Sequence, residues 1–189
     1  KYENGKDPAM VTGVKFGNQE LSEYKFSGKL AGLIESHGYI SKTTTTNPDG
    51  TTEVNTATKG IYPDMLTNLN NMTEAFANEF NRIHKAGYAL GETYAEGEVK
   101  KEGEDFFDFT PGNAAKTLVV NPKILDNPSL IAAGEKSGAS GDNLNAKALA
   151  ALKSLDFSKY DYYKAAGKTL PDGLTGNLDS FYAGVIGKL

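Results

Sequence analysis

The fold of this chain is decided by residues 65–83, MLTNLNNMTEAFANEFNRI. Large apolar residues recur there with a 4-3-4-4-3 spacing, which places them in one stripe along an α-helix. Polar residues such as Asn71, Asn78 and Arg82 lie opposite the stripe. We expect the stripe to pack into the core, either of this chain alone or also of an inter-subunit bundle, because the pattern does not identify a partner. Its members are Met65, Leu69, Met72, Phe76, Phe80 and Ile83.

The ends of this helix are also predicted by the sequence. Pro63 suits a first helical position, and Asp64 suits the positive N-terminal dipole. At the other end His84 and Lys85 can act as cations in the last turn, and Gly87 is a usual stop. The sequence therefore predicts one helix of about 35 Å at 1.5 Å per residue.

Composition limits the class of protein. The chain has 189 residues with 39% apolar content, enough for one sizeable core or two small subdomains. Its formal charge of -4 comes without a basic cluster, so we expect neither a nucleic acid nor a membrane as partner. The chain contains no cysteine and two histidines, His37 and His84, so we expect no cofactor and no metal.

The two ends of the sequence suggest a piece of a longer protein. No apolar run approaches the length of a membrane span, and the chain begins at Lys1 without a methionine or a signal-like segment. A helical stripe runs to the last residue through Leu178, Phe181, Val185 and Leu189. We expect the natural chain to continue beyond both ends.

Extended segments are short. Residues 10–26 predict a small two-stranded element, and residues 106–109 and 118–120 predict two further strands. Between residues 41 and 59, threonine-rich strands flank Asn47-Pro48-Asp49-Gly50, which predicts a solvated β-hairpin. A calcium loop is excluded there because the required regular carboxylates are missing.

Further helices are short. From Ser27 a helix with Leu30, Ala31, Leu33 and Ile34 is expected to pack tightly, since Gly28 and Gly32 permit close approach of a neighbouring backbone. Asn121-Pro122 and Asn127-Pro128 predict two capped helical turns, and Asp142 or Asn143 opens another helix. The fold class is therefore mainly α with minor β (α+β), an elongated helical rod or bundle domain with short strands and a projecting hairpin.

Catalytic patterns are weak. Glu102, Glu104 and Asp105 could serve acid–base chemistry in a glycosidase, but a polar loop favours solvated charge. Residues 134–137 lack the first glycine of a phosphate loop, and no Gly-x-Ser-x-Gly turn is present. We expect a structural or interaction module and no enzyme. The alternative is an extracellular hydrolase or glycan-binding module that uses residues 102–105 together with Tyr160, Tyr162 and Tyr163, which a cleft joining the two segments would favour.

Several segments in combination resemble the FlgK-type hook-associated proteins of the bacterial flagellum. Each segment is weak alone, but their order over residues 27–189 is specific. Another axial flagellar protein, such as the second junction protein or a flagellin, is a further alternative. The resembling segments are Ser27–Glu35, Ala75–Tyr88, Asp105–Phe107, Gly141–Leu149 and Phe181–Ile186.

The resemblance implies a non-catalytic structural protein at the junction between hook and filament. Such a protein is exported by the flagellar type III apparatus without a cleaved signal peptide, is located in the extracellular flagellum and acts by polymerisation. Its expected partners are copies of itself, the hook, the second junction protein and, for the full-length chain, an export chaperone. Because the terminal helices of the family are missing here, we expect a monomer.

The resemblance also implies a domain organisation. Residues 1–26 are the end of a β-rich subdomain, and residues 27–189 form a helical rod domain. The hairpin at residues 41–59 and an inserted stretch at about residues 156–173 are additions to the usual pattern. The stretch ends near Pro171 and contains the three tyrosines, but the sequence gives it no defined role.

Overall fold

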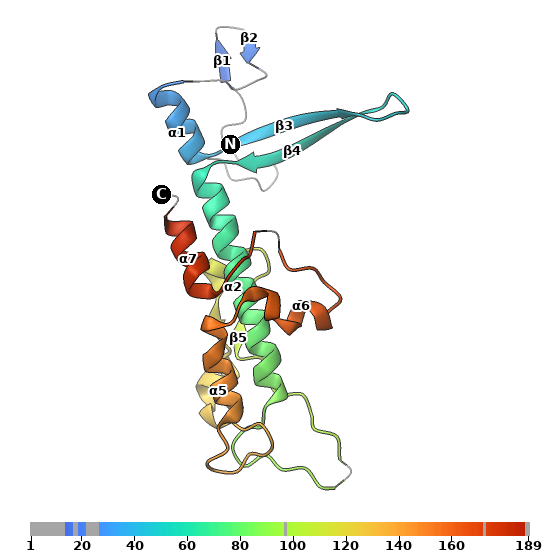
Figure 1. Cartoon of the computed structure of the whole chain (residues 1–189), viewed down its shortest axis with the longest axis vertical. Coiled ribbons are helices and arrows are strands. Elements are labelled where there is room, and N and C mark those ends of the chain that lie inside the picture. The colour runs from blue at the N-terminus through green and yellow to red at the C-terminus, as the bar shows by residue number, and fades with distance from the viewer. Residues whose placement is uncertain (1–13, 17–18, 22–26, 97, 172, 188–189) are drawn as a thin grey trace. The chain divides into compact units, whose positions relative to one another are not determined.

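The structure is a computed structural model that describes residues 14–16, 19–21, 27–96, 98–171 and 173–187. The chain divides into two compact units, Lys1–Thr67 with Lys188–Leu189 and Asn68–Gly187. The described residues form seven α-helices, three 3₁₀ helices and three two-stranded antiparallel sheets (Figure 1). The predicted class, mainly α with minor β, is confirmed.

The first unit begins with a small antiparallel pair. Strand β1 (Val14–Phe16) pairs with β2 (Gln19–Leu21), which confirms the two-stranded element. Its turn at residues 17–18 and the rest of residues 10–26 lie outside the described residues. The domain boundary expected at residue 26 falls there too and stays a prediction.

Helix α1 (Lys29–His37) follows, and Ile34 is buried as expected, but the close packing expected at Gly28 and Gly32 is wrong. Leu30 and Leu33 are 58% and 67% exposed, and a Cβ atom at Gly28 or Gly32 would meet nothing within 4 Å. The close approach occurs instead at Gly60, where a Cβ atom would lie 2.6 Å from the Cα of Gly38. Gly38 directly precedes β3 and Gly60 directly follows β4, so the pairing of Tyr39 with Lys59 brings these two glycines together just beyond the end of α1.

The β-hairpin is confirmed, with β3 (Tyr39–Thr46) paired to β4 (Thr52–Lys59) (Figure 1). The backbone N–H of Asn47 donates to the carbonyl of Thr51 at 2.8 Å, and the carboxylate of Asp49 accepts from the Thr51 N–H at 2.9 Å. Gly50 supplies the positive φ of 82° that the turn requires. Every residue of β4 is exposed, so local turn chemistry sets the register of this hairpin.

The long helix predicted around residues 65–83 is confirmed as α2 (Ile61–Ala86). It begins two residues before Pro63, which is compatible with proline because the first four N–H groups of a helix need no intrahelical acceptor. It ends directly before Gly87, as predicted.

The second unit adds short elements around the distal part of α2. Strand β5 (Phe107–Asp108) pairs with β6 (Val119–Val120), and α3 (Ala114–Thr117) lies between them in the chain. Asn121 caps α4 (Pro122–Asp126) and Asn127 caps η1 (Pro128–Leu130), each by accepting a hydrogen bond from a backbone N–H two residues ahead. Both predicted caps are confirmed.

The remaining elements complete this unit. They are α5 (Leu144–Ala151), η2 (Leu152–Ser154), η3 (Phe157–Lys159), α6 (Asp161–Ala165) and α7 (Leu178–Ile186). Asn177 and Ser180 form a capping box at the start of α7. Leu189, the last member of the expected stripe, lies outside the described residues.

The core of the second unit is built around Ala75 of α2. The buried cluster consists of Ala75, Leu152, Phe157, Tyr160, Tyr163 and Leu174. Stretch 156–173 thus supplies three of its six members, a role that its sequence does not reveal. Four residues of the expected stripe, Met72, Phe76, Phe80 and Ile83, are partly buried against this cluster. Met65 and Leu69 are also partly buried.

Candidate functional site

Three polar side chains of α2 are buried, although a helix pattern places polar residues in solvent. Glu79, Asn81 and His84 are 1%, 7% and 0% exposed, and Asn145 of α5 is 6% exposed. We call these four residues the polar anchors. A buried polar group is tolerated only when it is hydrogen-bonded, so their partners define what they do.

Glu79 attaches the start of α6 to α2. Its carboxylate accepts from Arg82 Nη2 at 2.7 Å and from the backbone N–H of Tyr162 at 2.6 Å. The hydrogen bond to Glu79 raises the pKa of Arg82. A carboxylate buried on this scale is stable only with such a cation and donor beside it, so the ion pair is part of the tertiary framework.

The side-chain amide of Asn81 forms hydrogen bonds with the backbone of the segment that leads into β5, as a neighbouring strand would. Its Oδ1 accepts from the N–H groups of Phe106 at 3.0 Å and Phe107 at 2.8 Å, and its Nδ2 donates to the carbonyl of Phe107 at 2.8 Å. The rings of both phenylalanines lie 4.9 Å from the ring of Phe80. Asn81 therefore binds the backbone of Phe106 and Phe107, while the adjacent Phe80 packs against their rings.

His84 connects two distant loops. The ring Nδ1 lies 2.9 Å from the carbonyl of Glu104, and Nε2 accepts from the N–H of Ala132 at 3.0 Å. These partners require a neutral ring with its proton on Nδ1, and burial lowers the pKa of His84. The expectation that His84 serves as a cation at the helix end is wrong, because the ring is buried between a carbonyl and an N–H.

Asn145 completes the set from the opposite side. Its Nδ2 donates to the carbonyl of Ala132 at 2.6 Å and to that of Ile83 at 3.2 Å. A Cβ atom at Gly87 would lie 2.1 Å from the same Nδ2, so the close approach requires glycine. The last turn of α2, residue 132 and the start of α5 therefore form one hydrogen-bonded group.

The pattern of apolar residues could not reveal the polar anchors. One signal was available, because all four lie in segments that carry the flagellar resemblance. Glu79, Asn81 and His84 belong to Ala75–Tyr88, and Asn145 belongs to Gly141–Leu149. The partners of Asn81 lie in or next to Asp105–Phe107 as well.

A small hollow joins the two segments named in the hydrolase alternative. It encloses about 280 Å³ and includes Glu102 and Tyr162 in its wall. Glu104 pairs instead with Lys123 at 2.8 Å, and Asp105 pairs with Lys85 at 3.2 Å. Among the described residues one carboxylate lines this hollow, whereas glycoside hydrolysis uses two. The full lining is Asn78, Asn81, Arg82, Lys85, Glu102, Tyr162, Ala165 and Ala166.

The other two tyrosines of that alternative belong to the core. The hydroxyl of Tyr160 donates to the carbonyl of Leu152 at 3.1 Å, and Tyr163 is buried in the same cluster. Burial raises the pKa of each to about 12. Tyr160 and Tyr163 therefore pack, and Tyr162 is the tyrosine of this group that borders the hollow.

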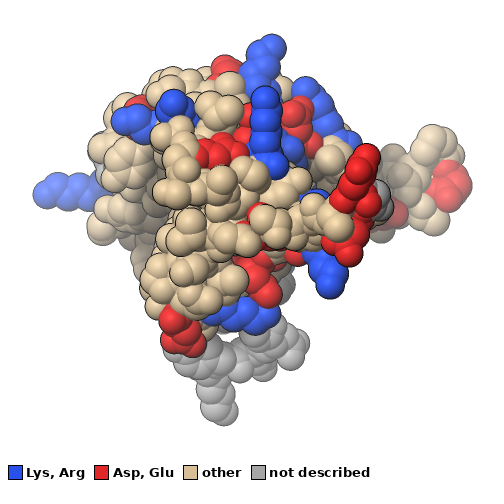
Figure 2. Space-filling model, turned by 90° about the horizontal axis from the view of Figure 1, so that it is seen from below, with Lys and Arg blue, Asp and Glu red and all other residues tan. Residues whose placement is uncertain are grey.

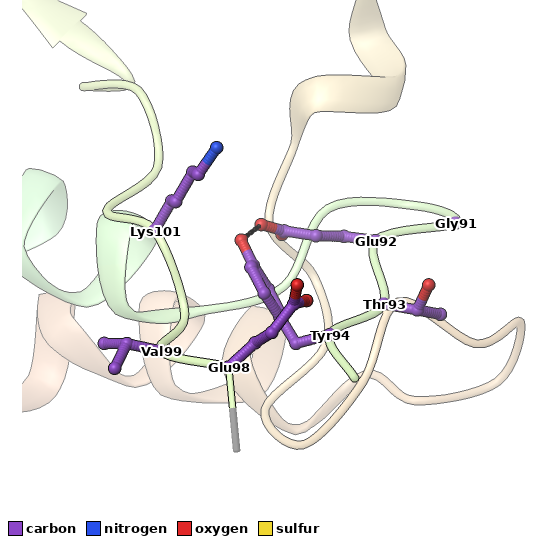
Figure 3. Close-up of a pocket in the computed structure, with 7 residues that line it drawn as sticks. All are labelled: Gly91, Glu92, Thr93, Tyr94, Glu98, Val99 and Lys101. Atoms are coloured by element: carbon purple, nitrogen blue, oxygen red, sulfur yellow. Dashed lines mark hydrogen bonds between the residues drawn. The ribbon is translucent and has the colours of Figure 1, made fainter. Parts of the chain in front are cut away.

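A larger and more open hollow of about 580 Å³ lies in the loop after α2 (Figure 3). The hydroxyl of Tyr94 donates to the carboxylate of Glu92, and this bond raises the pKa of Tyr94. Glu92 also accepts from the N–H of Ala89 at 2.8 Å, and Glu98 accepts from that of Ala95 at 3.0 Å. Both carboxylates thus stabilise the loop itself.

The glycine- and serine-rich loop at residues 134–142 is organised by Asp142. Its Oδ2 accepts from the N–H groups of Lys136 at 3.0 Å and Ser137 at 3.1 Å, and these bonds lower the pKa of Asp142. A phosphate loop presents such N–H groups to its ligand. Here the carboxylate of the chain itself occupies them.

Surface charge is mixed on the face drawn in Figure 2, where basic and acidic side chains are interspersed among uncharged residues. Within the ranges that the structure describes, every helix is too short or too polar to span a bilayer. In the same ranges no group of three or more His, Asp or Glu side chains is placed to hold a metal ion.

No family model and no solved structure matches the chain. The whole chain is 33% identical over 199 aligned positions to "Flagellar hook-associated protein 1" of Bacillus subtilis (strain 168). The chain spans 32% of the length of that protein. The resemblance drawn from residues 27–189 is therefore confirmed, and the similarity extends over about a third of the relative.

Proposed function

We propose that this chain is part of a structural, non-enzymatic protein of the bacterial flagellum. The observation that supports this most directly is the similarity of its whole length to a flagellar hook-associated protein. The polar anchors add a physical reason, because all four lie in the segments that carry the resemblance. A role in holding the fold together is sufficient to explain why these segments are similar, and no catalytic role is required.

The finer proposal places the protein at the junction between hook and filament. It acts there by polymerisation, with copies of itself, the hook and the second junction protein as partners, and with an export chaperone for the full-length chain. It reaches the extracellular flagellum by type III export without a cleaved signal peptide. The name of the relative, "hook-associated", supports this placement.

Within this role, the stripe from Met65 to Ile83 holds the helical domain together and the polar anchors attach the loops to it. The anchors connect segments 13 to 83 residues apart along the chain. Hydrogen bonds between distant segments suit a subunit that must keep its shape under mechanical force, because separating the segments leaves buried polar groups unpaired. The domain division into residues 1–26 and 27–189 belongs to the same proposal.

The test compares this chain with a version extended at both ends of its natural sequence. Light scattering coupled to size exclusion gives the mass of each, with and without hook subunits. We expect the extended chain to associate with hook subunits, and this chain to remain unassociated, since this proposal assigns the axial contacts to the added segments. Failure of the extended chain to associate with hook, filament or second-junction subunits would overturn the proposal.

A second candidate, a glycan-binding module, is favoured by the hollow that joins Glu102 and Tyr162. An aromatic ring beside charged and amide groups is a suitable lining for a sugar. Calorimetric titration of the chain with chitohexaose and cellohexaose tests it, and Tyr162→Ala is the matched variant. Saturable binding that Tyr162→Ala abolishes would favour this candidate, whereas no heat of binding would exclude these glycans.

A further inference from the structure

Strand β4 has a symmetric distribution of charge. Its acidic residue is Glu53 and its basic residue is Lys59, each three positions from Thr56. Both side chains are exposed, and neither makes an ion pair among the described residues. A strand of this kind is complementary to itself when a second copy runs antiparallel and Thr56 is the centre.

Among the residues that the structure describes, no strand pairs with the outer edge of β4. Because the N–H of Asn47 donates to the carbonyl of Thr51, the alternation of an antiparallel ladder turns the backbone groups of every second residue outward. On β4 these residues are Thr52, Val54, Thr56 and Thr58. Proteins usually protect such an edge with charged side chains, proline, a bulge or a covering segment. Strand β4 contains no proline, pairs in continuous register and is exposed throughout. Its two charged residues, Glu53 and Lys59, are opposite in sign, so they repel a second copy only in registers that bring like charges together.

We propose that β4 is an interface between two copies of this chain, paired antiparallel about a two-fold axis at Thr56. The outward groups of Thr56 then pair with Thr56 of the second copy, and those of Val54 pair with Thr58 of the second copy. Glu53 lies opposite Lys59 of the second copy at a position where side chains are closest, and symmetry repeats this ion pair. Two hairpins become one four-stranded sheet, and an isolated two-stranded hairpin is marginal by itself.

The other edge of the hairpin is a poorer interface. Strand β3 has a single charged residue, Lys42. Antiparallel pairing of two β3 strands about Thr44 places no opposite charges together, and pairing about Lys42 places two lysines face to face, which is unfavourable. Charge complementarity therefore selects β4.

This contact goes beyond the proposed flagellar function and does not depend on it. A two-fold contact uses the same surface on both copies and closes on itself, so it forms a dimer and no polymer. Edge pairing of one strand is a small interface, and such interfaces are weak. The expected monomer thus describes dilute solution, and the dimer forms as concentration rises.

The first test measures mass by sedimentation equilibrium from about 10 µM to about 1 mM, a range that covers weak association. We expect the chain to dimerise, and Glu53→Lys or Lys59→Glu each to weaken the dimer about tenfold, since attraction at two symmetric positions becomes repulsion. The double variant restores dimerisation. Within one chain residues 53 and 59 are about 20 Å apart at about 3.3 Å per residue, so restoration requires contact between copies. A monomer at every concentration, or a double variant as weak as the single ones, would overturn the proposal.

The second test uses the absence of cysteine from the natural sequence. Hydrogen-bonded partners in an antiparallel pair have Cα atoms about 5.5 Å apart, which suits a disulfide. We expect Thr56→Cys to form a disulfide-linked dimer under mild oxidation much faster than Thr44→Cys, the matched exposed threonine on the edge of β3. Equal rates for the two variants would show random collision and contradict the β4 interface.

Discussion

The β3–β4 hairpin and the distal half of α2 are both rich in polar residues, yet their structures depend on different parts of the sequence. The hairpin obtains its register from a turn between Asn47 and Thr51, four residues apart. The polar anchors of α2 obtain their partners from segments as far away as Tyr162, 83 positions along the chain from Glu79. A polar residue stays in solvent in the first case and is buried in the second. The difference lies in whether another segment arrives to pair with it.

The largest expected effect is at the phenylalanine that supports the anchored loop. Phe80→Ala removes the ring that contacts Phe106 and Phe107 at 4.9 Å and should lower the free energy of unfolding by about 3 kcal/mol. Urea denaturation measures the change, and it also tests the proposed packing role of the stripe. Val54→Ala on the exposed hairpin is the control and should cost less than about 0.5 kcal/mol. Equal effects of the two substitutions would contradict the comparison.

The second expected effect compares two asparagines. Asn81→Ala leaves the N–H groups of Phe106 and Phe107 without their acceptor and should cost about 2 kcal/mol in the same assay. Asn55→Ala, on exposed β4, should stay within about 0.5 kcal/mol of the natural chain. If Asn81→Ala were neutral, the amide of Asn81 would not support the segment that leads into β5.

The third effect depends on pH and concerns His84. Burial lowers its pKa in the folded chain, so the unfolded chain binds a proton first as pH falls. The contribution of His84 to stability is therefore complete above about pH 6.5 and is lost below that value, at about 1.4 kcal/mol per unit of lowered pKa. Urea midpoints measured between pH 8 and pH 5 should fall more steeply for the natural chain than for His84→Asn.

The control for the pH experiment is the other histidine, His37. His37→Gln should retain the steep fall of the natural chain, because His84 is intact. A steep fall that persists in His84→Asn would assign the pH dependence to carboxylates and not to the buried ring.

The smallest expected effect is in the turn of the hairpin. The carboxylate of Asp49 accepts hydrogen bonds from the hydroxyl and the N–H of Thr51, and these bonds lower the pKa of Asp49. Asp49→Ala removes this acceptor. We expect faster amide exchange in β3 and β4, measured by NMR, and an unchanged urea midpoint for the second unit. A shifted midpoint would show that the hairpin contributes to the stability of the second unit, and the proposed contrast between local and distant determinants would fail.

Several local elements follow from neighbouring residues alone. The asparagine–proline caps of α4 and η1 and the turn at residues 47–50 each depend on residues within one turn of the chain. Propensity and hydrogen-bonding chemistry at that range are readable in any sequence. The helix around residues 65–83 is equally readable, because its apolar spacing repeats over five turns.

The failures have a common physical cause. From the sequence His84 is expected to be a cation at a helix end, but in the structure its Nε2 accepts a hydrogen bond from the N–H of Ala132. From the sequence, stretch 156–173 is an insertion without a defined role, but in the structure its residues Phe157, Tyr160 and Tyr163 are buried in one cluster with Ala75. The hollow between Glu102 and Tyr162 likewise joins segments 60 residues apart. Each outcome depends on a contact made after the chain has folded, and periodicity contains no record of such contacts.

The sequence by itself determined where α2, the capped turns at Asn121 and Asn127 and the hairpin form, because those choices rest on apolar spacing and on hydrogen bonds between near neighbours. It also contained the similarity to a flagellar hook-associated protein, which the comparison with a relative bears out. Tertiary structure alone decided which polar side chains are buried and what they hold. Burial of Glu79, Asn81 and His84 is stable only because distant segments supply donors and acceptors that replace water.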